Sequence, residues 1–200
     1  MTVHELAVKA GLSVPEARLE RFSKRGSTFL VKRFDRTPGN GRIHFASAMT
    51  LLGKNDGASA QDGTSYLELV ECIIKYGFQP EKDLEELWKR IVFSIAVSNT
   101  DDHLRNHGFL LKGSSWYLSP AYDINPSPFG NGLSLNINEH DNSLDFELAL
   151  KAAPWFHLDA KKSRSLLDEI RSAVAPWKKM ATDYGISRTE INRMKAAFHE

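Results

Sequence analysis

The apolar residues of the chain recur mostly at helical spacing, and glycine or proline interrupts the runs. This spacing predicts helices over residues 4–10, 45–52, 66–74, 81–98, 145–152, 159–184 and 187–198. Thr64 offers an N-cap to the third run, and Pro154 and Pro176 interrupt the carboxy-terminal stretch. The chain is therefore predicted to be mainly helical.

The helix predicted over residues 81–98 differs from the others because its second half is apolar all round. Such a helix belongs at the centre of a domain. Pro80 at its start and the carboxylates in its first turns favour a helix, since negative charge complements the positive end of the helix dipole. This most buried segment leads directly into the most polar one, residues 99–106.

Strand-like runs are short and come in two pairs, each around a turn. The pairs are residues 17–22 with 28–34 around a turn at 24–27, and residues 108–112 with 116–118 around a turn at 113–115. Each pair predicts a β-hairpin. Two hairpins among many helices indicate an α+β, mainly α, fold in a single domain over residues 1–200.

The composition excludes several classes of protein. The 26 basic and 25 acidic residues give a net charge of +1, so the chain lacks the positive excess of an obligate nucleic-acid binder. A basic face from residues 161–164 and 178–179 remains an alternative to a solvated helix surface.

Cys72 lies in an apolar run without a disulfide partner, and no run approaches the ~18 apolar residues of a membrane span. The sequence predicts a soluble, cytoplasmic protein.

Three polar residues carry the strongest chemical signal. Asp101 and Asn106 share the loop after the buried helix, and Asp123 follows the second hairpin. Phosphoryl transfer needs a carboxylate that accepts the proton of the attacking hydroxyl, an amide oxygen that holds a divalent ion, and a carboxylate that bridges metal and phosphates. The hairpin would return Asp123 to face Asn106. Hard oxygen ligands of this kind favour Mg²⁺ over zinc.

Simpler roles are open for the same loop. Asp101 or Asp102 could cap a turn or a helix through bonds to backbone amides. His103 and His107 could bind a transition metal if the segment were helical, although Gly108 and the strand-like residues beyond it argue against this. His107 would otherwise be a hydrogen-bonded loop histidine.

Several segments also carry a family resemblance. They read GLSVP at residues 11–15, VKRFDR at 31–36, NTDDHLRN at 99–106 and LSPAYD at 118–123. The chain resembles the carboxy-terminal part of HipA-like serine/threonine kinases, whose hinge, catalytic loop and metal-binding loop these segments match. The resemblance is weakest after about residue 142.

The resemblance implies a protein-kinase-like carboxy-terminal lobe. Residues 1–36 would form a helix and a hinge-like hairpin, and residues 37–200 a helical lobe with its catalytic loop region at 99–123. No glycine-rich phosphate-covering loop or strand lysine precedes the hinge, so the amino-terminal lobe is expected to be largely absent.

The resemblance also assigns roles in the loops. Asp101 would be the catalytic aspartate, and Asn106 and Asp123 would hold Mg²⁺. His103 would support the loop and belong to both the catalytic and the ATP-binding residues.

At the hinge, the resemblance places the cofactor ATP against Lys32, Phe34 and Asp35, with the backbone of residues 32–34 contacting adenine. A plainer interpretation is an exposed ion-pair cluster of Arg33, Asp35 and Arg36, since surface pairs contribute at most about 1 kcal/mol. Phe34 could equally be a packing aromatic.

Family members are toxins of bacterial toxin–antitoxin modules that phosphorylate aminoacyl-tRNA synthetases on serine or threonine. The resemblance therefore implies a protein substrate, an antitoxin or a missing-lobe chain as partner, and DNA only through the antitoxin. One alternative is an inactive, truncated kinase-like subunit that acts as a binding module. Another is a small-molecule phosphotransferase using the same loop.

Two expectations concern packing. The four tryptophans, Trp88, Trp116, Trp155 and Trp177, are interpreted as packing residues. Apolar residues near Leu6, Leu19 and Phe29 are expected to be exposed on the face that would contact the missing lobe.

Overall fold

The structure, a computed structural model, describes residues 1–23 and 26–199. It is α+β, with 44% helix and 16% strand, so helices dominate as the sequence predicts. The helices are α1 (Thr2–Lys9), α2 (Ala48–Leu51), α3 (Tyr66–Tyr76), α4 (Pro80–Ala96), α5 (Phe146–Ala152), α6 (Ala160–Val174), α7 (Trp177–Asp183) and α8 (Arg188–Met194). Short 3₁₀ segments are η1 (Ala60–Asp62), η2 (Ala153–Phe156) and η3 (Lys195–Ala197). The strands are β1 (Ala17–Ser23), β2 (Gly26–Val31), β3 (Phe45–Ser47), β4 (Gly108–Lys112) and β5 (Ser115–Leu118).

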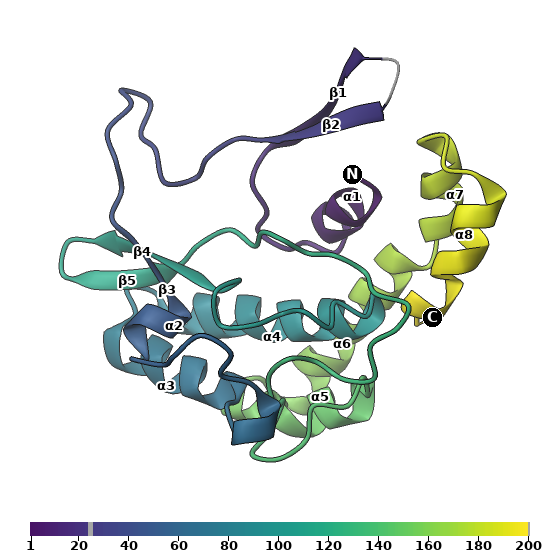
Figure 1. Cartoon of the computed structure of the whole chain (residues 1–200). Helices are drawn as coiled ribbons and strands as arrows, with labels where there is room; N and C mark the ends of the chain where they lie inside the picture. The colour runs from purple at the N-terminus through teal and green to yellow at the C-terminus, as the bar shows by residue number, and fades with distance from the viewer. Residues whose placement is uncertain (24–25, 200) are drawn as a thin grey trace.

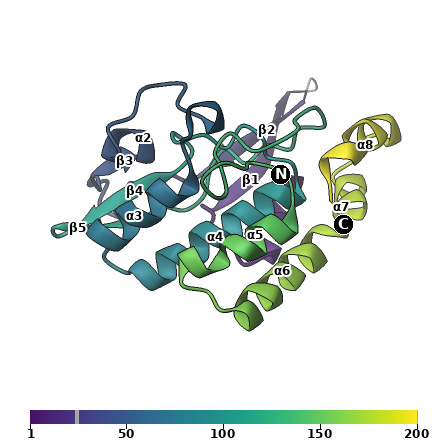
Figure 2. The same ribbon diagram turned by 90° about the horizontal axis from the view of Figure 1, so that it is seen from below.

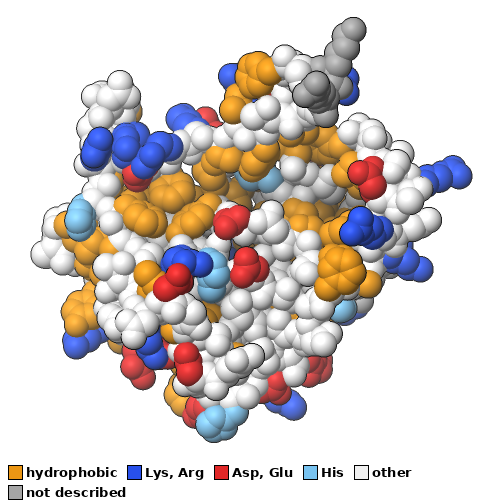
Figure 3. Space-filling view, in the orientation of Figure 1, with side chains coloured by type: hydrophobic (Ala, Val, Ile, Leu, Met, Phe, Trp, Pro, Cys, Tyr) orange, Lys and Arg blue, Asp and Glu red, His pale blue; other side chains and the backbone are white. Residues whose placement is uncertain are grey.

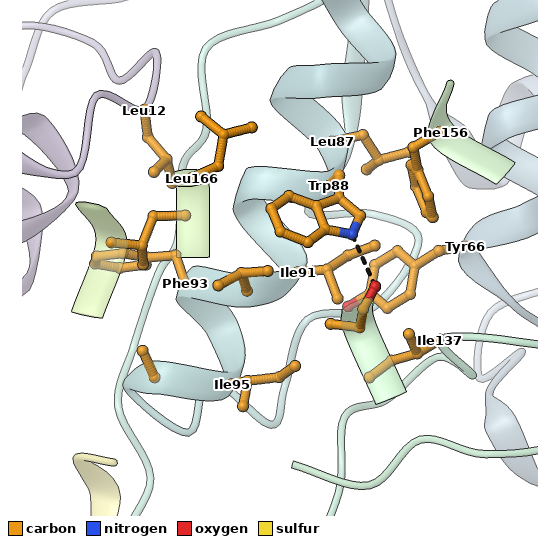
Figure 4. Close-up of a cluster of buried hydrophobic side chains, with 14 of the residues drawn as sticks. Leu12, Tyr66, Leu87, Trp88, Ile91, Phe93, Ile95, Ile137, Phe156 and Leu166 are labelled. Carbon is orange, nitrogen blue, oxygen red and sulfur yellow. Dashed lines mark hydrogen bonds between the residues drawn. The ribbon is translucent and has the colours of Figure 1, made fainter. Parts of the chain in front are cut away.

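Helix α4 forms the centre of the core, as its apolar second half predicts. It contacts α3, α5, α6 and β5, and Figures 1 and 2 show it running through the middle of the molecule. Trp88 is fully buried, and its indole Nε1–H donates to the carbonyl of Ala149 at 2.9 Å, which ties α4 to α5 (Figure 4). A buried indole with a satisfied N–H both fills volume and fixes orientation.

The sheet contains a strand that the sequence pattern did not predict. Strands β3, β4 and β5 form an antiparallel sheet in that order, and the register pairs Phe45 with Leu110. The helix predicted over residues 45–52 is therefore wrong in its first half, and only α2 is helical. Pairing with β4 outweighs the helical spacing there, because sheet pairing across the fold overrides local preference.

The amino-terminal hairpin is confirmed as a two-stranded ribbon, β1–β2, which projects from the body in Figure 1. Its second strand ends at Val31, so residues 32–34 leave the ribbon earlier than predicted. The predicted turn at residues 24–27 falls partly on residues 24–25, which lie outside the described residues.

Helix boundaries follow local capping. Helix α3 begins after Ser65, whose capping box with Glu68 replaces the predicted N-cap Thr64. The carboxy-terminal run breaks at Pro176 into α6 and α7, because proline has no N–H for a helical hydrogen bond. None of the described helices is long and apolar enough to span a bilayer.

The packing expectations are only partly correct. Trp88 and Trp177 are buried, whereas Trp155 is 54% exposed, so its interpretation as a packing residue is wrong. Leu6 is fully buried because α1 packs on α6 and α7, which contradicts the prediction that it is exposed. Leu19 and Phe29 on the ribbon are exposed, as predicted.

Candidate active site

The polar loop expected to carry the chemistry begins where α4 ends, and other segments hold its start. Ser98 has a left-handed backbone with φ of 47°, which turns the chain out of the helix. Its carbonyl accepts from the backbone N–H of Ser127 at 3.0 Å. The side-chain oxygen of Asn99 accepts from the backbone N–H of Asn125 at 3.1 Å. The loop start is thus bonded to the segment that follows Asp123.

A buried polar network fixes the middle of the loop. The Tyr66 hydroxyl at the start of α3 donates to Asp102 Oδ2 at 2.7 Å, and His107 Nε2 lies 3.0 Å from Asp102 Oδ1. Burial, then the charge of Asp102, raises the pKa of Tyr66 well above its usual range. Burial alone would raise the pKa of Asp102, but His107 and Tyr66 outweigh it and lower that pKa. The network pins the loop to α3 and to the start of β4.

This network corrects two alternatives from the sequence. The Asp102 side chain bonds other buried side chains, so the capping role considered for it is wrong. His107 faces Asp102 instead of pairing with His103, so the two-histidine metal site is not formed. The sequence does contain a signal for this role of Asp102, which lies between an apolar helix and a strand. A charged residue in such a place is typically buried and held by hydrogen bonds.

Asn106 and Asp123 converge, as the hairpin geometry predicts. The Asn106 side chain is buried, and its Nδ2 donates to Asp123 Oδ2 at 3.0 Å. Asn106 Oδ1 accepts from the backbone N–H of His103 at 3.2 Å. Asp123 Oδ1 accepts from Asn125 Nδ2 at 2.7 Å. The β4–β5 hairpin therefore joins two segments that are seventeen positions apart in sequence.

The backbone at Asp123 is unusual. Its φ of 58° lies in the left-handed region, which non-glycine residues rarely occupy and which concentrates at functional sites. The preceding Tyr122 donates its hydroxyl to the carbonyl of Arg105 at 2.6 Å, and burial raises the pKa of Tyr122 to about 12. The bond from Tyr122 back to the loop supplies the support that such a conformation requires.

Asp101 and His103 occupy the outer side of the same loop. Asp101 is exposed, and its carbonyl accepts from the His103 backbone N–H at 3.0 Å. His103 Nε2 lies 3.2 Å from an Arg105 guanidinium nitrogen, and Arg105 pairs with Asp56 at 2.6 Å. The predicted catalytic carboxylate therefore faces solvent, in the same loop as buried Asn106.

The predicted hinge residues lie on a separate segment with contacts of their own. Lys32 pairs with Glu16 at 2.9 Å, and a cavity of about 420 Å³ lies beside them along the ribbon. Asp35 bonds Arg33 and Arg36, and the bond from Arg33 holds the pKa of Asp35 well below its usual range. The ion-pair cluster considered for these residues is therefore present.

Phe34 connects the hinge to the site. Its ring lies 5.7 Å from the Tyr122 ring and 6.1 Å from the Phe45 ring, measured between centroids. These three rings form an aromatic cluster directly before Asp123. The structure thus brings Phe34 to the segment before Asp123, whereas the side-chain contacts of Lys32 and Asp35 are with Glu16 and arginines of their own segment.

The donor set fits a magnesium ion that also binds phosphates. Asn106 and Asp123 offer amide and carboxylate oxygens, and Mg²⁺ typically uses one or two carboxylates together with phosphate oxygens and waters. Within the described residues, no group of three His, Cys, Asp or Glu is placed to hold a metal by itself. Asn106 and Asp123 are the residues that would hold such an ion.

Comparisons with known proteins agree with this arrangement. A family model described as HipA-like C-terminal domain matches residues 1–177. A Haemophilus influenzae protein named "Putative kinase" is 29% identical over 130 residues, which are 60% of this chain and 38% of that relative. "Putative kinase Y4dM" of Sinorhizobium fredii is 27% identical over 132 residues, which are 60% of this chain and 31% of that relative. The chain thus aligns with about a third of the length of these curated relatives.

Solved structures share the fold. A chain of the Shewanella oneidensis MR-1 complex of HipA, HipB and operator DNA superposes with a TM-score of 0.75 at 20% identity, covering 97% of this chain and 51% of that one. The Helicobacter pylori proinflammatory kinase CtkA superposes with a TM-score of 0.57 at 14% identity, covering 96% of this chain and 86% of that one. A chain of the HipA-containing complex and the kinase CtkA therefore both contain this arrangement of helices and strands.

Proposed function

Because the chain belongs to the HipA-like C-terminal domain family, we propose that it forms the catalytic-loop lobe of an ATP- and Mg²⁺-dependent serine/threonine kinase. The observation that carries the proposal is the 3.0 Å bond that joins buried Asn106 to the strained Asp123. The loop that contains Asn106 also contains the exposed residue Asp101, so the chain offers the carboxylate, amide and second carboxylate that phosphoryl transfer requires.

Each residue then has a role set by its position. Asp101 orients the acceptor hydroxyl and takes its proton, because its exposed carboxylate can reach an incoming side chain. Asn106 and Asp123 would hold Mg²⁺, which when bound would neutralise phosphate charge. His103 supports the loop through its backbone bond to Asn106. The protein thus supplies positioning and electrostatic stabilisation, which are the main contributions to phosphoryl transfer.

ATP would lie between this site and the hinge. The backbone of residues 32–34 would contact adenine, with Lys32 and Asp35 at the edge of the nucleotide site. The aromatic cluster of Phe34, Phe45 and Tyr122 supports this placement, because it offers an apolar surface between the hinge and Asp123. Small-molecule and cofactor sites are lined predominantly by hydrophobic and aromatic side chains.

The partners follow from the family and from the ribbon. The similar S. oneidensis structure contains HipA with HipB and operator DNA, which supports an antitoxin as partner and indirect contact with DNA. Leu19, Phe22, Phe29 and Val31 are exposed on the ribbon, and Figure 3 shows hydrophobic side chains gathered along it and below it. A two-stranded ribbon is marginal alone, so an amino-terminal lobe or a partner chain is proposed to cover it. The phosphorylated substrate is proposed to be a protein, by family analogy an aminoacyl-tRNA synthetase.

The same exposed ribbon favours one alternative, a catalytically inactive kinase-like subunit that binds a protein partner. Mg²⁺–ATP binding and ³²P transfer from labelled ATP to protein distinguish the two functions. With the proposed amino-terminal lobe or partner chain present, the kinase proposal expects binding and transfer by the wild-type chain, and loss of transfer with retained nucleotide binding in Asp101→Asn. Binding without transfer by the wild type would favour the inactive subunit, and equal transfer by Asp101→Asn would contradict the assigned base.

A further inference from the structure

An apolar groove lies between α3 and η2, and it shares no lining residue with the site at Asn106 and Asp123. The groove has a volume of about 620 Å³, which is within the range of ligand-binding clefts. Its apolar lining comes from α3 and η2 and consists of Leu67, Val70, Ile74, Pro154 and Trp155.

Trp155 is held in an exposed position by its neighbours. Phe156, the next residue, is buried in the core cluster that Figure 4 shows, so η2 is anchored there. His157 has a left-handed backbone with φ of 57°, and its Nδ1 lies 2.9 Å from Glu81 Oε1 at the start of α4. Trp155 is therefore 54% exposed on a fixed segment, and Ile74 across the groove is 51% exposed.

The rim of the groove is acidic. Glu71 and Glu139 line it and are exposed, and within the described parts of the chain neither makes an ion pair. Glu68 also lines it but pairs with Lys54 at 2.8 Å. A net negative rim repels nucleic acid and anionic lipid surfaces, both of which require basic residues.

We propose that this groove binds a basic amphipathic helix of another protein. An amphipathic helix places apolar anchors at i, i+3 or i+4, and i+7 into such a groove, and exposed aromatic side chains are the common anchor points of interfaces. Leu67, Ile74 and Trp155 would receive the apolar face, and lysine or arginine on the flank would meet Glu71 and Glu139. Electrostatic complementarity of this kind selects the sign of the partner.

A second copy of this chain is a poorer occupant. Two of the three basic residues in its most basic helical segment, the first half of α6, already make ion pairs within the protein. Lys162 lies 3.4 Å from Glu85, and Arg164 lies 3.2 Å from Glu147. The proposal is independent of the kinase activity, because none of the groove residues belongs to the proposed catalytic machinery.

The test uses a fluorescein-labelled synthetic helix of leucine and lysine, with its leucines on one face, and a matched helix of leucine and glutamate. Binding to the whole chain is measured by fluorescence anisotropy. The leucine–lysine peptide is expected to bind, and the double variant Glu71→Lys with Glu139→Lys should weaken binding by at least about tenfold. Trp155→Ala should weaken it similarly, and increasing salt should weaken binding to the wild type.

The matched control is Asp168→Lys with Asp183→Lys, which makes the same charge change on exposed residues of α6 and α7. It should change binding less than twofold. Equal losses in the two double variants, or equal binding of the leucine–glutamate peptide, would overturn the proposal. A wild-type dimer in light scattering that Trp155→Ala abolishes would assign the groove to a second copy and would also overturn it.

Discussion

Removing the hydroxyl of Tyr66 tests whether the buried network holds the catalytic loop. The hydroxyl donates to Asp102 Oδ2 at 2.7 Å, and both side chains are buried. A hydrogen bond to a charged group contributes about 1.5–3 kcal/mol. In Tyr66→Phe, the donor that remains for Asp102 Oδ2 among the described residues is Ser94 Oγ. Its distance of 3.5 Å is too long to replace the lost hydrogen bond. The free energy of unfolding should therefore fall by about 2 kcal/mol.

Urea unfolding followed by circular dichroism measures this loss, and a chain of 200 residues should also melt about 4–8 °C lower. Tyr76→Phe is the control, because Tyr76 is 48% exposed and its loss should change stability by less than about 0.5 kcal/mol. A double-mutant cycle with Asp102→Asn should give a coupling energy of about 1–3 kcal/mol. A loss below about 0.5 kcal/mol in Tyr66→Phe, or additive effects in the cycle, would refute the reasoning.

Further predictions concern stability. Burial raises the pKa of Asp83 despite its hydrogen bonds, so the Asp83 carboxyl holds its proton more tightly in the folded protein than in the unfolded chain. The contribution of Asp83 to the free energy of unfolding is therefore full below about pH 3.8 and declines as the pH rises through the raised pKa. When the free energy of unfolding in urea is compared at pH 3.5 and pH 7, Asp83→Asn should lack this part of the decline that the wild type shows. A Cβ at Gly130 would lie 2.3 Å from the Thr100 side chain, so Gly130→Ala should lower stability by about 1–3 kcal/mol, whereas Gly39→Ala has open space and should not. His199→Ala removes the 2.9 Å contact with Ser98 and should cost about 0.5–1.5 kcal/mol in the same assay; an unchanged value would show that this contact does not stabilise the fold.

Helices with strong local signals were predictable, and the pairing of distant segments was not. Helix α4 combines Pro80, an acidic first turn and an apolar second half, all of which act locally. Strand β3 has apolar residues at helical spacing, yet it pairs with β4 more than sixty positions away. The spacing of apolar residues within one segment contains no information about which distant strand that segment will pair with. The exposure of Trp155 was missed for the same reason, because it depends on how Phe156 and His157 anchor η2.

One part of the candidate site, the approach of Asp123 to Asn106, was predictable because a short hairpin connects the two residues along the chain. The hairpin between Asn106 and Asp123 forces the two segments together, and the 3.0 Å bond between them confirms this expectation. His107 is bonded to Asp102, which agrees with its interpretation as a hydrogen-bonded loop histidine. The role of Asp102 was not predictable, because its partner Tyr66 lies 36 positions before it. The catalytic and cofactor roles assigned to Asp101, His103, Asn106 and Asp123, and to the hinge residues Lys32, Phe34 and Asp35, stay predictions.

The melting temperature with and without Mg²⁺–ATP tests the central claim most directly, because a ligand that binds the folded state raises its stability by mass action. At a concentration 100 times the dissociation constant the gain is about 2.7 kcal/mol, or about 5–10 °C for a chain of this size. The account predicts this shift in the wild type and in the surface control Asp168→Asn, and its loss in Asp123→Asn or when Mg²⁺ is chelated. An equal shift in Asp123→Asn, or no shift in the wild type, would contradict the claim that Asn106 and Asp123 form the metal–nucleotide site.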